Sequence, residues 1–161
     1  MSAVNTIELV LGTDLLHRDL IDVPSRGALA EEIVEEESLL PRALTKQHKD
    51  LLHRWNGIGL DVIRLFGCGQ HSDSRGRLHA MQVPALNSSD GALVIGTDPS
   101  GFIYLENRSG VIASYDSDGG DLKRLASSVD ELFELIVFGA GANEFAGEEW
   151  LDDLRRFQIV R

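Results

Sequence analysis

The clearest pattern of apolar and polar positions lies between Leu40 and Phe66, where a helical repeat leads directly into a strand-like run. Four apolar positions and one histidine share a helical face; they are Leu44, His48, Leu51, Leu52 and Trp55. Thr45 is suited to cap the first turn, and Asn56-Gly57 is a pair that tolerates a left-handed helix end. The pattern predicts a short helix that ends sharply before a strand over Ile58–Phe66.

On the N-terminal side of this block the pattern is less decisive. Residues 6–22 carry a broken apolar run that fits either a strand or a short helix. A second helix is expected to start at Pro24-Ser25, with Leu29 and Ile33 on its apolar side and glutamates around the remainder. Its exposed side would be strongly anionic.

The C-terminal half predicts an antiparallel meander followed by helices. Residues 67–90 are rich in Gly, Ser, Asp and Arg and read as a long loop, with one optional strand at Leu78–Val83. Three strands are expected next, at Ala92–Ile95, Phe102–Glu106 and Val111–Tyr115. Two helices follow, at 128–138 and 148–157, and a capping box of Ser128 and Glu131 begins the first of them. The order predicts an α+β fold with an antiparallel-rich central sheet flanked by helices.

Composition favours one domain over residues 1–161. The chain has 161 residues and 43% hydrophobic content, enough for one core but little for two. The lone Cys68 cannot form an internal disulfide, and the first residues lack the basic and apolar regions of a secretory signal. No apolar stretch approaches the roughly 20 residues that a membrane-spanning helix requires. We therefore expect a cytoplasmic protein without a membrane span.

The net charge of −11 argues against direct nucleic-acid binding and suits a partner with a basic surface. The acidic residues form three clusters. Solubility alone explains any single cluster, but the like-charged i, i+4 pairs Glu31–Glu35 and Glu32–Glu36 each cost about 0.2–0.5 kcal/mol in an isolated helix. The candidate partner-binding residues are Glu32, Glu35 and Glu36 on the helix and Asp116, Asp118 and Asp121 after the meander. The third acidic cluster lies within residues 144–153.

Motifs for catalysis, metals and cofactors are incomplete. Gly96-Thr-Asp-Pro-Ser-Gly101 has phosphate-loop glycines but is followed by Phe102-Ile103 instead of Lys and Ser or Thr. The Asp116–Asp121 segment fails the EF-hand pattern, and His48 and His53 are five residues apart and diverge around a helix. We therefore expect no metal, no cofactor and no enzymatic activity.

The order of turns and core positions resembles the SMI1/KNR4 family, also called the SUKH superfamily. The resemblance covers about residues 25–138 and rests on the helix from Leu44 to Asn56-Gly57 and on the turn Ile95-Gly96-Thr97-Asp98. It implies an SMI1/KNR4-like domain in which Leu44, Leu51, Leu52, Trp55, Asn56, Gly57, Gly96 and Asp98 are structural.

The resemblance also implies a function that needs no reaction. It points to a bacterial immunity protein that binds and neutralises a cognate toxin, and a nuclease with a basic groove would suit the charge. Two alternatives are a regulatory protein-interaction scaffold and, with less support, an unrecognised hydrolase that uses carboxylates or Cys68.

Overall fold

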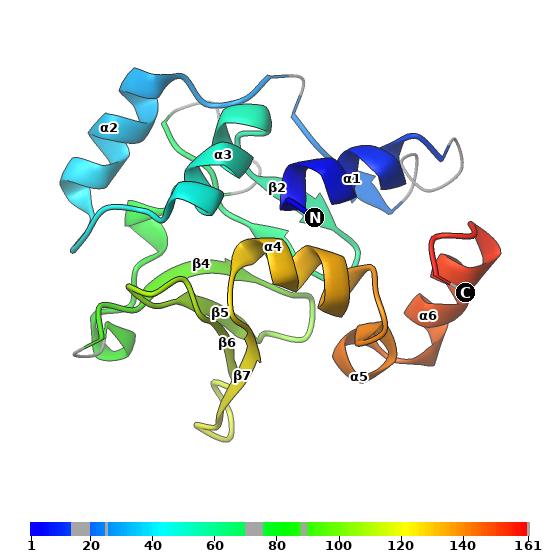
Figure 1. Cartoon of the computed structure of the whole chain (residues 1–161). Coiled ribbons are helices and arrows are strands. Elements are labelled where there is room, and N and C mark those ends of the chain that lie inside the picture. The colour runs from blue at the N-terminus through cyan, green and yellow to red at the C-terminus, as the bar shows by residue number, and fades with distance from the viewer. Residues whose placement is uncertain (14–19, 25, 70–75, 88–89, 161) are drawn as a thin grey trace.

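The protein is a single α+β domain with an antiparallel sheet, as the sequence pattern predicts, and the sheet has seven strands within the described residues (Figure 1). The computed structural model describes residues 1–13, 20–24, 26–69, 76–87 and 90–160. The strands are ordered β1 to β7, each hydrogen-bonded to the next in the chain. Their bounds are β1 Ile21–Asp22, β2 Ile58–Leu60, β3 Arg64–Leu65, β4 Leu93–Thr97, β5 Ile103–Glu106, β6 Ile112–Tyr115 and β7 Leu122–Ala126.

The helices gather on one side of the β4–β7 part of the sheet, and the turn between β6 and β7 reaches away from them (Figure 1). Their bounds are α1 Ala3–Leu11, α2 Ala30–Leu39, α3 Lys46–Arg54, α4 Val129–Glu131, the π-helix η4 Leu132–Val137, α5 Ala142–Ala146 and α6 Glu148–Arg156. The core between them and the sheet is apolar, with Trp55, Phe133 and Ile63 among its fully buried side chains. Within the described ranges, no helix is long and apolar enough to cross a bilayer.

The N-terminal region contains both elements that its pattern allowed. α1 forms over Ala3–Leu11, where the Ser2 hydroxyl accepts a hydrogen bond from Asn5 N in the first turn. The two residues of β1 then pair with β2. The apolar run is thus divided between a helix and an edge strand.

α2 starts later than the sequence predicts. Pro24 lies outside the helix, Ser25 lies outside the described residues, and α2 begins at Ala30. The preceding backbone instead pairs with the end of α3, since Ala28 N donates to Leu52 O at 2.7 Å. Gly27 permits this approach, because a Cβ there would lie 1.7 Å from the carbonyl oxygen of His53. The predicted apolar side is half correct, since Ile33 is buried but Leu29 is 56% exposed.

The single strand predicted over Ile58–Phe66 is wrong, because the segment folds back on itself. β2 and β3 form a hairpin, closed by a hydrogen bond of 2.7 Å from Leu60 N to Ile63 O. The optional strand at Leu78–Val83 is also absent: the short 3-10 helices η2 His79–Met81 and η3 Pro84–Leu86 take that part of the loop. The Gln82 side-chain amide occupies the position of a neighbouring strand, pairing with Val94 N and O at 3.0 and 2.9 Å.

The later helices are largely as predicted. Ser128 caps α4 by accepting from Glu131 N at 3.1 Å, whereas the Glu131 carboxylate binds the N–H and hydroxyl of Ser127 instead of closing the expected box. The helix continues as η4, with Phe138 N bonded to Phe133 O five residues back. α6 buries Trp150 and Leu154.

Candidate functional site

The glutamates of α2 are divided between the surface and the interior. Glu35 is exposed, but the side chain of Glu32 is only 17% exposed and Glu36 is fully buried. Glu32 closes the first turn of α2, where its carboxylate accepts from Leu29 N at 2.8 Å and from the Arg26 guanidinium at 3.1 Å. The anionic face predicted from sequence is therefore smaller than expected, because a buried carboxylate such as Glu36 has no surface to offer a partner.

Glu36 is the centre of a buried ionic cluster. Its carboxylate accepts from His79 N at 2.7 Å and from Gly69 N at 3.3 Å, and it lies 2.8 Å from His79 Nδ1 and 3.4 Å from the Arg77 guanidinium. Burial alone would raise the pKa of Glu36, but the bonds from His79 and Gly69 outweigh it and lower the pKa below its usual value. The ionised side chain joins α2 to the loop after β3.

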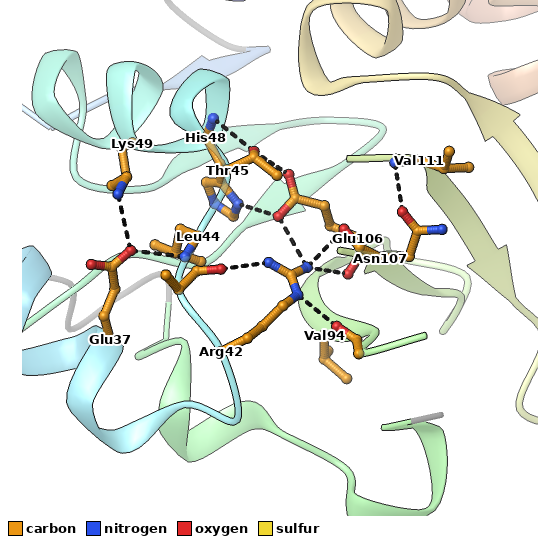
Figure 2. A network of polar contacts seen from close by, with 12 residues as sticks. Glu37, Arg42, Leu44, Thr45, His48, Lys49, Val94, Glu106, Asn107 and Val111 are labelled. Carbon is orange, nitrogen blue, oxygen red and sulfur yellow. Dashed lines mark hydrogen bonds and ion pairs between the residues drawn. The ribbon is translucent and has the colours of Figure 1, made fainter. Parts of the chain in front are cut away.

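A second buried cluster surrounds Glu106 at the end of β5 (Figure 2). Its carboxylate accepts from Thr45 Oγ1 at 2.7 Å and lies 3.4 Å from both His48 Nδ1 and the Arg42 guanidinium. The same guanidinium donates to the carbonyl oxygens of Glu106 at 2.6 Å and Asn107 at 2.9 Å. Burial opposes ionisation, yet the charges of His48 and Arg42 and the hydrogen bonds from His48 and Thr45 lower the pKa of Glu106.

These two clusters hold helices to the sheet and the loop, and sequence reasoning missed both. The available signal for Glu106 was strand alternation: Tyr104 and Glu106 lie two residues apart on one face, so a buried Tyr104 implies an inward Glu106. His48 was recognised as part of the helix face, and it is fully buried there. Its Nε2 has no hydrogen-bond partner among the described residues.

The junction between α3 and β2 keeps its predicted place but uses its residues differently. Thr45 caps α3, and Leu44, Leu51, Leu52 and Trp55 are all buried. The left-handed residue is Gly57, with φ of 88°, and Asn56 is not left-handed. Asn56 instead points its buried amide at Cys68, donating to Cys68 O at 2.8 Å and accepting from Cys68 N at 2.6 Å.

The turn at Gly96 and Asp98 is structural. A Cβ at Gly96 would lie 2.3 Å from Arg64 O, so glycine permits the close contact of β3 and β4, next to a bulge in the pairing of β4 with β5. The Asp98 carboxylate closes the next turn, accepting from Ser100 N at 2.9 Å, Phe102 N at 3.0 Å and the Tyr104 hydroxyl at 2.8 Å.

The predicted cluster of Asp116, Asp118 and Asp121 forms the turn between β6 and β7. Asp116 is the structural member: its carboxylate accepts from Asp118 N at 2.9 Å, and its N–H donates to Asp121 O at 2.9 Å. Asp118 and Asp121 are exposed and form no ion pair with any described residue. No group of three or more potential metal ligands occurs in the part of the chain that the structure describes.

An apolar hollow of about 410 Å³ lies beside this acidic turn, on the sheet face opposite α5, and Ala85 and Leu86 of η3 also line it. The cross-strand pairs Leu105–Ala113 and Tyr115–Leu122 alternate onto this face. Leu122, the residue next to Asp121, is 64% exposed. A partly exposed apolar floor with carboxylates at its end is a surface that can bind a protein with apolar and basic side chains.

Cys68 is poorly suited to nucleophilic catalysis. Its side chain is fully buried, and burial together with the negative charge of Glu36 raises the pKa of the thiol to about 12. The thiolate, which is the reactive form, is therefore disfavoured at neutral pH.

Comparison with known proteins adds no relationship. No protein-family model matches this chain, and no curated protein matches it. The SMI1/KNR4 resemblance therefore remains a prediction from its turns and core positions.

Proposed function

We propose that this chain is a non-enzymatic immunity protein that acts in the cytoplasm by binding and neutralising a cognate toxin with a basic surface. The observation that carries the proposal is the acidic turn between β6 and β7, where exposed Asp118 and Asp121 adjoin the exposed apolar side chain of Leu122. Exposed carboxylates attract a basic partner at a distance, and the apolar side chains beside them supply contact area once the partner has docked.

The distribution of charge supports this choice of surface. Glu36 and Glu106 are enclosed by basic and hydroxyl side chains, so their charges are locally compensated. Asp118 and Asp121 have no such compensation among the described residues and contribute directly to the external field. The attraction between this turn and a basic partner is strong at low salt and weaker when salt screens both surfaces.

The first experiment uses the protein encoded by the reading frame adjacent to this gene. It is expressed in bacteria with and without this chain, and growth is measured. Rescue of growth by this chain supports immunity. A harmless neighbour that nevertheless binds this chain would instead favour a regulatory scaffold.

The second experiment measures association rates with that protein by stopped-flow fluorescence at increasing salt. The double variant Asp118→Asn/Asp121→Asn should bind more slowly at low salt and show a weaker salt dependence. Glu148→Gln/Glu149→Gln is a matched control, since it removes the same charge from the exposed start of α6. An association rate unchanged by salt and by the aspartate variant would refute electrostatic docking at this turn.

A further inference from the structure

The outer edge of β7 is an unpaired sheet edge. β7 is the last strand of the sheet, and within the described ranges no hydrogen bond from outside the sheet reaches the backbone of Leu122–Ala126. Three of its five residues, Leu122, Lys123 and Arg124, are exposed. Such an edge offers a row of backbone N–H and C=O groups to another extended chain.

Hollows lie on both sheet faces beside this edge. On the helix-covered face, consecutive residues Lys123, Arg124 and Leu125 line a hollow of about 440 Å³, which is bounded across from them by Ile136 and Phe145. On the open face, Leu122 and Arg124 line the apolar hollow of about 410 Å³ described above. A strand added to β7 would send alternate side chains to opposite faces and so towards both hollows.

The charges along β7 indicate what such a strand should carry. The Lys123 ammonium is already bound to the Glu144 carboxylate at 2.7 Å. The Arg124 guanidinium is exposed and forms no ion pair with any described residue. An opposite charge directly across from it on the added strand would be favourable, because cross-strand pairs of opposite charge stabilise a sheet.

A second copy of this chain fits the edge poorly. Full antiparallel overlap of two β7 strands, centred on Arg124, places Arg124 directly opposite its own counterpart. Like charges in that position are destabilising, and basic side chains on edge strands commonly prevent such self-pairing.

We propose that β7 receives an extended segment of a partner protein as an eighth strand. The segment carries a carboxylate opposite Arg124 and apolar side chains that enter the hollow lined by Ile136 and Phe145. This inference rests on the proposal that the chain is a protein-binding domain, and it adds the form and chemistry of the bound segment.

The test uses a displayed library of linear twelve-residue peptides selected against the intact chain. Enriched peptides should share an acidic residue flanked by alternating apolar residues. In NMR hydrogen exchange, the best of them should slow exchange of the β7 amides without protecting the distant β1 edge. Failure to enrich any peptide, or protection away from β7, would overturn the inference.

Charge exchange supplies the decisive control. Arg124→Glu should weaken binding of the selected peptide by about tenfold, and replacing the peptide's acidic residue with Lys should restore it. Arg156→Glu, an equal charge change at the exposed end of α6, should alter affinity less than about twofold. Equal losses in both variants, or no rescue by the Lys peptide, would refute pairing at Arg124.

Two further outcomes separate the competing explanations. A concentration-dependent dimer whose β7 amides are protected would replace the partner segment with a second copy. Growth rescue by a chain whose β7 binds no peptide would reject strand addition while leaving the proposed immunity function intact.

Discussion

Replacing Glu36 with Gln should destabilise the protein strongly. The buried carboxylate receives close contacts from His79 N and His79 Nδ1 and longer ones from Gly69 N and Arg77. Hydrogen bonds to a charged group contribute about 1.5–3 kcal/mol each, and an amide NH₂ would face donors in place of one carboxylate oxygen. The Arg77 side chain is 33% exposed and can turn to solvent, which limits its share of the loss. We therefore expect a loss of about 3 kcal/mol of unfolding free energy.

The assay is urea unfolding monitored by tryptophan fluorescence, with the slope against urea checked for constancy. A loss of about 3 kcal/mol corresponds to a fall in Tm of about 6–12 °C for a chain of this size. Glu35→Gln is the matched control, because it makes the same chemical change one residue earlier on the exposed side of α2 and should stay within about 0.5 kcal/mol of the parent. If Glu36→Gln were as stable as Glu35→Gln, the buried cluster would not hold α2 in place.

Three further perturbations test other parts of the fold. Asn56→Leu should lower the unfolding free energy by about 2–4 kcal/mol, because it leaves the N–H and C=O of Cys68 unpaired. Calorimetry on the folded fraction should find the affinity for the partner unchanged. Intact stability with lost binding would place Asn56 in the interface. Gly27→Ala should lower Tm far more than Gly59→Ala, because the added Cβ would meet His53 O at 1.7 Å in the first case but only make ordinary contact with Asp22, no nearer than 3.4 Å, in the second. Equal Tm values would contradict that close approach. The pKa of Glu106 is lowered from 4.5, so the stabilisation of the fold by the ionised Glu106 carboxylate is present above pH 4.5 and is lost as pH falls through the folded-state pKa. Plots of stability against pH should therefore be flatter below pH 4.5 for Glu106→Gln than for the parent. Parallel plots would refute the lowered pKa of Glu106.

Sequence reasoning succeeded where the determinants are local. The spacing of Leu51, Leu52 and Trp55, with Thr45 as a cap, specifies α3 without reference to any distant segment. The turn residues between β4, β5 and β6 likewise specify the meander. β7 was missed because its residues are exposed along most of its length, so it lacks the alternation that identifies a half-buried strand.

The buried charges could not be predicted for a different reason. Glu36 lies 43 residues from His79, and Arg42 lies 64 residues from Glu106, so both clusters depend on the tertiary arrangement. In the sequence, Glu36 belongs to the same acidic run as Glu35, and only its helical spacing from Ile33 and Leu40 separates the two. The Asp116–Asp121 turn was located correctly from its turn residues, but the hollow beside it arises only when β5, β6 and β7 are paired.

This separation of surface from interior decides how binding through charge can be tested. A set of variants chosen from sequence would neutralise Glu32, Glu35 and Glu36 together, yet Glu36 supports the packing of α2 and Glu32 closes its first turn. Loss of binding in that triple variant would follow from unfolding as readily as from a lost interface. Asp118 and Asp121 make no side-chain ion pair with any described residue, so neutralising them changes the external field while leaving the core intact. A binding defect in the aspartate variant at unchanged Tm would therefore report on the partner contact itself.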